Sequence, residues 1–159
     1  MSLESVARDA ATTVPSLRRR YADKAALAGA VVDSLRIEPL PSPGGPPRTR
    51  ALAILENFQR NLEREHSIAL LGTLLAEEAR TPELVERFRA RLVNPRRAGL
   101  TDAIKAGIAA GELSADADAE VLASALIGSF YARYVERGGT PRGWPRRVLG
   151  QIWPPAPSE

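Results

Sequence analysis

The sequence predicts an all-α protein in which a small N-terminal helix-turn-helix head precedes a larger helical body. Apolar residues recur at spacings of three and four along most of the chain, which is the period of an amphipathic helix. No segment shows the alternating pattern that is typical of a strand. The proline- and glycine-rich stretch from Pro39 to Pro47 cannot be helical, so it divides the head from the body.

Composition narrows the possible functions. The chain has 159 residues, which suits a small head on one compact domain. It has no cysteine and only one histidine, His66, so we expect no disulfide, no zinc finger and no metal site. Without a Gly-rich phosphate loop or a nucleophile–base pair, we expect neither an enzyme nor a cofactor. Charges interrupt every apolar stretch, which predicts a cytoplasmic protein with no membrane partner, and the net charge of +3 permits contact with nucleic acid.

The predicted head covers residues 1–36. A short apolar helix leads into the turn Ala10–Thr12, after which Thr13 and Pro15 form a helix-start signal followed by Arg18–Arg20. A helix, a tight turn and a capped basic helix in this order form the helix-turn-helix arrangement that places side chains in the major groove of DNA.

The remaining segments follow from composition and periodicity. We place a linker at 37–47, the helical body at 48–153 and a tail at 154–159. Within the body, apolar spacing predicts helices over 48–65, 67–79, 119–135 and 144–153.

Between the second and third of these helices, Thr81 and Pro82 should cap and begin another helix. The dipeptide Asn94-Pro95 must kink or break that helix midway, because proline has no amide hydrogen to donate. Gly111–Leu113 should end it.

The helix predicted over 119–135 is apolar nearly all round, so it should be buried on two sides. One side can pack in the protomer's own core. The small residues Val121, Ala125, Gly128 and Ala132 on an adjoining face would let a partner helix approach closely.

The residues of the head resemble a known motif. Ser2–Ala7, Ala10–Thr13, Pro15–Tyr21 and Lys24–Leu27 are similar to the head of the tetracycline-repressor (TetR) family, which reads approximately (T)-x-x-x-IA-x-x-AGVS-x-x-x-LY-x-(R/H)-F-x-x-K-x-x-L. The body, with its long helix, Gly-Glu-Leu turn and apolar penultimate helix, resembles that family's regulatory and dimerisation domain. The resemblance implies a homodimer that binds double-stranded DNA and a small-molecule effector.

The chain departs from the family pattern in three places. Ala11 replaces the turn glycine, which would cost about 1–2 kcal/mol if the backbone there is left-handed. Arg18 replaces an aromatic residue. The usual first helix of the head is missing, so we expect either a true start farther upstream or a degenerate head.

Three sets of candidate residues follow from the resemblance and the helix positions. The DNA-binding set comprises Thr12, Thr13, Ser16, Arg18, Arg19 and Lys24. The ligand-pocket set comprises Phe58, Leu62, Leu70, Leu74, Phe88, Leu92 and Tyr131. The dimer-interface set comprises Leu122, Ala125, Leu126, Ser129, Phe130, Val148 and Ile152.

Each set has a plainer interpretation. Thr13 is expected mainly to cap its helix, and an exposed arginine run is usually a solvated face. Each pocket residue taken singly is more simply core, and the last two helices could serve only to complete one protomer's core. His66 is expected to be a surface or capping residue.

Two functional hypotheses remain. The leading one is a ligand-responsive transcriptional repressor that binds an operator as a homodimer. The alternative is a helical dimeric module that binds a ligand or partner and carries a vestigial head that does not bind DNA.

Overall fold

The computed structural model describes residues 3–41 and 44–154, except for the side chain of Lys24. Over these residues the chain is all-helical, as predicted, and no strand occurs. The elements are α1 (Leu3–Asp9), α2 (Val14–Arg20), α3 (Lys24–Ser34), α4 (Pro47–Leu62), α5 (Ser67–Ala76), α6 (Pro82–Phe88), the π-helical stretch η1 (Arg89–Val93), α7 (Asn94–Ala109), α8 (Ala119–Arg137) and α9 (Trp144–Ile152).

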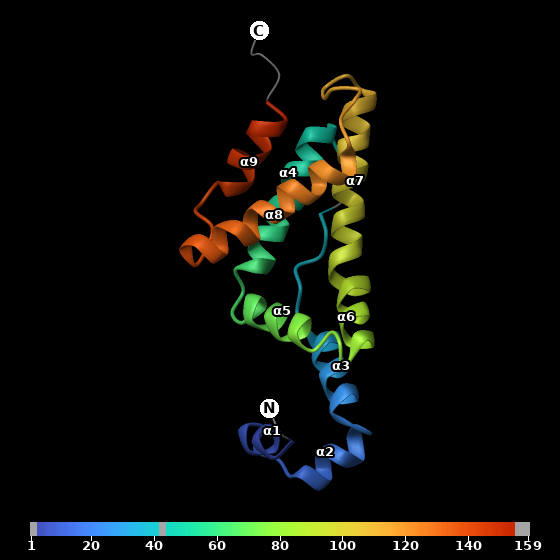
Figure 1. Ribbon diagram of the computed structural model, residues 1–159, viewed down its shortest axis with the longest axis vertical. Helices are drawn as coiled ribbons and strands as arrows, with labels where there is room; N and C mark the ends of the chain where they lie inside the picture. The colour runs from blue at the N-terminus through green and yellow to red at the C-terminus, as the bar shows by residue number, and fades with distance from the viewer. Residues whose placement is uncertain (1–2, 42–43, 155–159) are drawn as a thin grey trace.

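The molecule is elongated, with the head at one end (Figure 1). Helices α1 and α2 lie at that end, and α3 leads from them to the body. The consecutive elements α6, η1 and α7 form one long rod along the side of the body. Helices α4 and α8 pack beside the α7 half of this rod, and α9 packs against α4 and α8. The head and the C-terminal helix therefore lie at opposite ends of the molecule.

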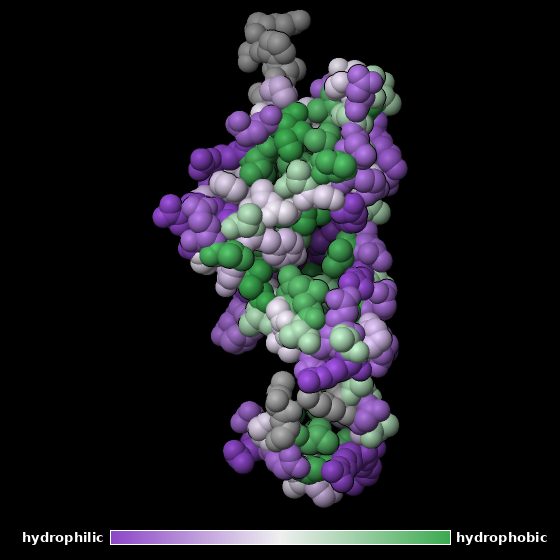
Figure 2. Space-filling model, in the orientation of Figure 1, coloured by the Kyte–Doolittle hydropathy of each residue, from purple (hydrophilic) through white to green (hydrophobic). Residues whose placement is uncertain are grey.

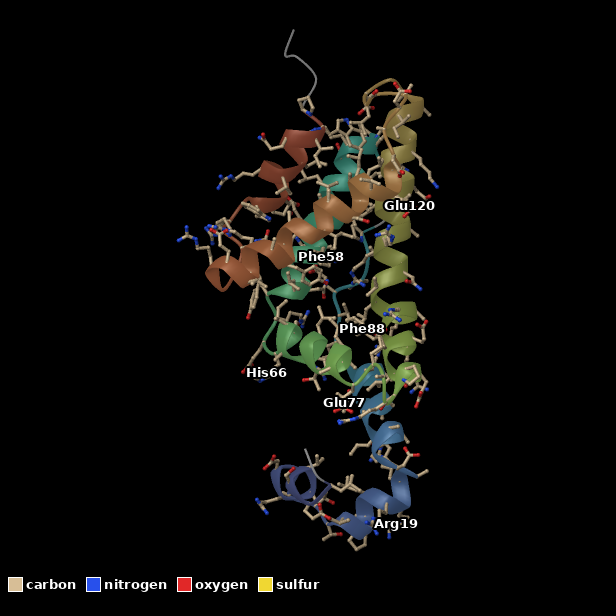
Figure 3. The ribbon with its side chains drawn as sticks, in the orientation of Figure 1. Arg19, Phe58, His66, Glu77, Phe88 and Glu120 are labelled. Atoms are coloured by element: carbon tan, nitrogen blue, oxygen red, sulfur yellow. The ribbon has the colours of Figure 1, made fainter. Side chains whose placement is uncertain are left out.

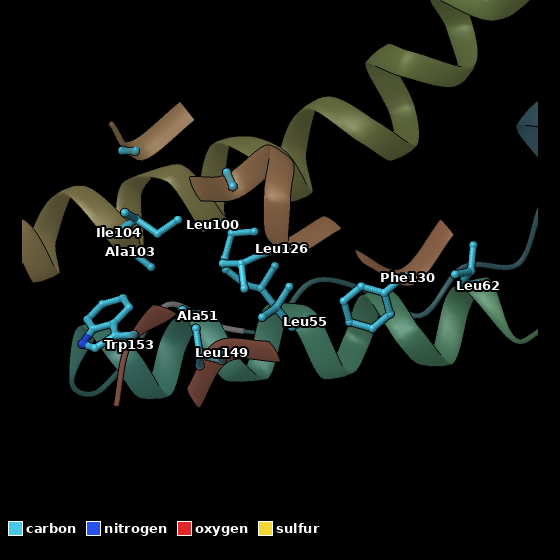
Figure 4. Packing of buried hydrophobic residues seen from close by; sticks show 13 residues of the cluster. Ala51, Leu55, Leu62, Leu100, Ala103, Ile104, Leu126, Phe130, Leu149 and Trp153 are labelled. Carbon is cyan, nitrogen blue, oxygen red and sulfur yellow. The ribbon is translucent and has the colours of Figure 1, made fainter. Parts of the chain in front are cut away.

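The main hydrophobic core lies where α4, α7, α8 and α9 meet (Figure 4). Leu55 of α4 and Leu100 of α7 are fully buried there, together with Phe130 of α8. Burying side chains of this size contributes about 1.5–3 kcal/mol each. The same cluster also contains Ala51, Ile54, Leu62, Ala103, Ile104, Ala119, Ala123, Leu126, Leu149 and Trp153.

One close approach fixes α9 against α7. The ring of Trp153 lies on the backbone of α7, and a Cβ atom at Gly107 would lie 2.3 Å from two of its ring carbons. Only glycine fits there without moving the ring. The large Trp153 ring at the end of α9 thus occupies the space that a side chain in place of Gly107 would need.

A second, smaller core joins α3 to the body. It consists of Val32 from α3, Leu74 from α5, and Leu84 and Val85 from α6. Because Val32 is only 1% exposed, α3 is anchored to the body, although the sequence assigned it to the head.

Several predicted boundaries shift. The helix predicted over 48–65 is α4, which ends at Leu62, and the one predicted over 67–79 is α5, which ends at Ala76. Thr81 takes the N-cap position of α6, but its side chain makes no capping hydrogen bond.

The predicted disturbance at Asn94-Pro95 is a π-helical stretch rather than a break. The amide of Asn94 donates to the carbonyl of Arg89, five residues back, instead of to the residue four back. This wider turn accommodates Pro95, which has no amide hydrogen to donate, so the rod continues without a break.

Ala11 has a left-handed backbone, with φ of 48°, so the condition stated for a steric cost at this position is met. Its side chain therefore carries the steric cost that glycine would avoid. Among the described residues, no helix is long and apolar enough to cross a membrane.

Candidate functional site

A cavity of about 430 Å³ lies between the two hydrophobic cores. Six of the seven predicted pocket residues line it, namely Phe58, Leu62, Leu70, Phe88, Leu92 and Tyr131. In Figure 3, Phe58 of α4 and Phe88 at the end of α6 mark two of its walls, with His66 at the α4–α5 connection. The seventh residue, Leu74, is buried in the smaller core and does not reach the cavity.

The wall also contains residues that the sequence analysis did not find. Val31 and Leu35 line the cavity from the end of α3, and Ile37 lines it from the segment that follows. Ile127 of α8, Val93 of η1 and Leu71 of α5 are further apolar additions. No local signal marks the first three, because they become part of the wall only when α3 packs on the body.

Aromatic rings form one side of the cavity. Phe58 meets Phe130 edge to face, with centroids 5.2 Å apart, and meets Tyr131 in the same way at 5.8 Å. Burial raises the pKa of the Tyr131 phenol, so the hydroxyl is neutral at physiological pH. Figure 2 shows hydrophobic side chains on this face of the body, bordered by hydrophilic ones along the rod.

The segment between α3 and α4 is bound to the body by buried amides. Asn57 is 1% exposed, and its Nδ2 donates to the carbonyl of Pro39 at 2.8 Å. Asn61 accepts the amide hydrogen of Glu38 at 2.9 Å. The predicted linker therefore runs along α4 at this point and does not span open space.

Arg96 of α7 completes this polar cluster and lines the cavity. It is 8% exposed, and it donates to the Asn57 amide oxygen at 3.2 Å, the Leu92 carbonyl at 3.0 Å and the Glu38 carbonyl at 2.9 Å. Desolvation lowers its pKa, and the more distant Glu38 carboxylate opposes that shift only in part.

The Glu38 carboxylate is occupied elsewhere. Arg60 Nε donates to it at 2.7 Å and Arg60 Nη2 at 3.0 Å. This hydrogen bonding holds the pKa of Glu38 below its usual value. No carboxylate is therefore in contact with the Arg96 guanidinium within the described residues.

Two further arginines line the cavity without an ion pair or side-chain hydrogen bond to a described residue. These are Arg36 and Arg64, and both are exposed. Arg97 also lines the cavity, but it binds Glu120 at 2.7 Å.

Side chains of α6 and η1 hold the end of α3 beside the cavity. Arg91 donates to the carbonyls of Val32 and, at 3.2 Å, Leu35. Arg87 pairs with Asp33 at 3.1 Å. Two arginine side chains of the rod thus contact the last turn of α3, close to the residues of that turn that line the cavity.

The head presents its basic helix to solvent. Thr13 caps α2 by accepting the Ser16 amide hydrogen at 3.3 Å, as predicted. Arg18 and Arg19 are exposed and form no ion pair with described residues, and Figure 3 shows Arg19 at the end of the molecule.

The other two members of the DNA-binding set occupy the turn and the next helix. Thr12 is exposed in the turn before α2. Lys24 begins α3, and its side chain lies outside the described residues. Ala7 is the one buried residue described within α1 and α2, so the head has little core of its own.

The residues of the predicted dimer interface divide into two groups. Leu126 and Phe130 are buried in the protomer's own core, at 1% and 0% exposure, so they present no surface to a partner. Ala125 is exposed, and the half-buried members are Leu122, Ser129, Val148 and Ile152.

The free face of α8 carries a stripe of small and apolar side chains, all exposed, which comprises Val121, Ala125, Gly128, Ala132 and Val135. Val121 and Val135 are 62% and 87% exposed, so no other described part of the protomer covers either end of this stripe.

Comparison with known proteins gives one match. A family model described as the tetracyclin repressor-like C-terminal domain matches residues 41–152. No family model detected an N-terminal DNA-binding domain. The searches of curated proteins and of solved structures found no match.

Proposed function

Because the chain belongs to the tetracycline-repressor family, a family of regulators and not of enzymes, we propose that it is a ligand-responsive repressor that binds operator DNA as a homodimer in the cytoplasm. The observation that carries this proposal is the double role of α3. This helix directly follows the basic helix α2, and it contributes Val31 and Leu35 to the cavity wall.

The mechanism we propose is a shift between two positions of α3. A ligand in the cavity contacts the same turn of α3 that Arg91 and Arg87 hold from the rod. A ligand that fits only one position of that turn would favour one orientation of α2. In a dimer, this would change the spacing of two heads that must fit successive major grooves, about 34–36 Å apart.

The homodimer is part of the proposal. The exposed stripe on α8 supports it, since small side chains at spacings of three and four let a partner helix approach closely. Two copies of α8 and α9 would then form a four-helix interface with two-fold symmetry.

An alternative function is a dimeric ligand-binding module that does not bind DNA. The small core of α1 and α2 favours it, because a head with one buried residue is weakly held in a fixed shape. Salt dependence separates the two functions, since binding to DNA phosphates weakens steeply as salt rises.

The test is binding of the full chain to the DNA flanking its own gene, measured across a salt series. We expect specific binding, and we expect Arg19→Ala to weaken it by about 1–3 kcal/mol if Arg19 contacts a base, or to reduce the salt slope by about one if it contacts a phosphate. Arg142→Ala, in the loop between α8 and α9, is the matched control. Equal affinities for Arg19→Ala and the unchanged chain would contradict the assignment of α2 as the DNA-contacting helix.

A further inference from the structure

The cavity contains a buried cation without a carboxylate partner. Arg96 is more than nine-tenths buried and lines the cavity, yet its three hydrogen bonds go to two backbone carbonyls and one amide oxygen, all of them neutral. A buried charge is costly unless an opposite charge accompanies it. This site is therefore poised to accept an anion.

The Arg96 guanidinium also has N–H donors that no described residue accepts. Arginine carries five N–H groups, and Arg96 uses one on each of its three nitrogens. One N–H on each terminal nitrogen has no acceptor among the described residues. A carboxylate has two oxygens, so it can accept from both terminal nitrogens of one guanidinium.

Most of the charged side chains around the cavity are positive. Its lining includes the four arginines Arg36, Arg64, Arg96 and Arg97 and a single carboxylate, Glu65. Glu65 is strongly exposed and pairs with His66 at 3.3 Å, and Arg97 is already bound to Glu120. The Glu38 carboxylate, whose charge acts on Arg96, is held by Arg60.

Apart from Asn61, His66, Ser67 and the Tyr131 hydroxyl, the rest of the wall is apolar. Phe58, Phe88 and Tyr131 supply aromatic surface, and leucine, isoleucine and valine side chains fill the space between them. A fully polar anion such as phosphate would leave this surface uncovered. The Tyr131 hydroxyl, which makes no hydrogen bond with a described residue, is one further polar group that a ligand can reach.

We propose that the cavity binds an amphipathic organic acid, whose carboxylate pairs with Arg96 and whose apolar body lies against Phe58, Phe88 and Tyr131. This inference rests on the proposed effector site and names the chemical class of the effector. Arg36 and Arg64, exposed and unpaired, attract the anion to the cavity.

The test compares three ligands that differ only in the head group. Octanoate, octanol and octylamine are titrated into the full chain by calorimetry at neutral pH, without DNA. We expect octanoate to bind at least about tenfold more tightly than octanol, because a charge-assisted pair is stronger than a neutral hydrogen bond, and octylamine to bind most weakly.

Arg96→Met is expected to abolish the preference for the acid while the affinity for octanol changes little. Because Arg96 also supports the segment at Glu38, a second variant does not depend on it. Arg36→Gln combined with Arg64→Gln should weaken octanoate binding a few-fold at low salt and not at high salt. Arg142→Gln is the surface control and should leave all three affinities unchanged.

Octanol binding as tightly as octanoate, octylamine binding most tightly, or no binding of octanoate would each overturn the proposal. The titration involves no DNA, so its result is independent of whether the head binds an operator. If DNA binding holds and octanoate fails, the acid assignment alone is wrong. If octanoate binds as expected and DNA binding fails, the regulatory function is wrong and the ligand class stands.

Discussion

The connection between η1 and the last turn of α3 can be tested with one substitution. In Arg91→Met, the two hydrogen bonds from the guanidinium to the carbonyls of Val32 and Leu35 are lost, while the side chain keeps much of its length. We expect the end of α3 to open more often, with the rest of the fold unchanged.

The size of the effect follows from the exposure of the arginine. A hydrogen bond to a charged group contributes about 1.5–3 kcal/mol when sheltered from water, and Arg91 is exposed, so about a third of that value applies to each bond. The loss should total about 1–2 kcal/mol, which corresponds to a factor of about 5–30 in the opening equilibrium. The Arg87–Asp33 pair and the buried Val32 remain, so α3 stays attached.

Hydrogen exchange measured by mass spectrometry is a suitable assay, because local opening controls the exchange of protected amides. Peptides that cover 28–35 should exchange about 5–30 times faster in Arg91→Met, while peptides from α4 and α7 should not change. Arg89→Met is the matched control, since Arg89 lies in the same π-helical stretch but binds Glu78 and Glu86. An unchanged rate in Arg91→Met, or an equal increase in the control, would refute the reasoning.

Three further predictions concern the core, the interface and pH. Gly107→Ala should destabilise the fold by about 1–3 kcal/mol in urea denaturation, because the added methyl group overlaps the Trp153 ring, and an unchanged midpoint would contradict this packing. Ala125→Arg should yield folded monomers by light scattering, whereas Leu126→Arg should unfold the protomer; a folded dimer of Ala125→Arg would argue against the α8 interface. Folding raises the pKa of Tyr131 above its unfolded value of about 10, so the native state favours the neutral phenol, and this contribution is complete below pH 10 and is lost as pH rises beyond it. Tyr131→Phe should therefore lose less stability than the unchanged chain as pH rises above about 10, and parallel losses in urea titrations of the two proteins would contradict this role.

Local signals in the sequence predicted the helix starts well. Thr13 acts as the N-cap that the sequence predicted, because its hydroxyl reaches the free amides of the first turn whatever the rest of the fold does. Helix ends were predicted less well, as α4 and α5 show. The turn between them is set by how the two helices pack, and it carries His66 with a left-handed φ of 65°.

The candidate site was predictable only in part, for a related reason. Apolar spacing marks the inward face of a helix, so it identified Phe58 and Tyr131 without distinguishing a cavity from a core. It could not identify Val31 or Arg96 as cavity residues. Their positions depend on contacts between segments far apart in the sequence, such as Arg91 with Val32 and Arg96 with Glu38, and a local pattern carries no information about these.

The location of the cavity between two separate cores has a consequence for how such a protein evolves. Phe58 and Tyr131 belong to the margin of the larger core, and Leu70 and Phe88 to the margin of the smaller one. Substitutions at these margins remove few contacts from either centre, so they change the shape of the cavity at a modest loss of folding free energy. A lineage with this architecture can therefore reshape its cavity through a few steps of small cost, while the exposed stripe on α8 and the head stay unchanged.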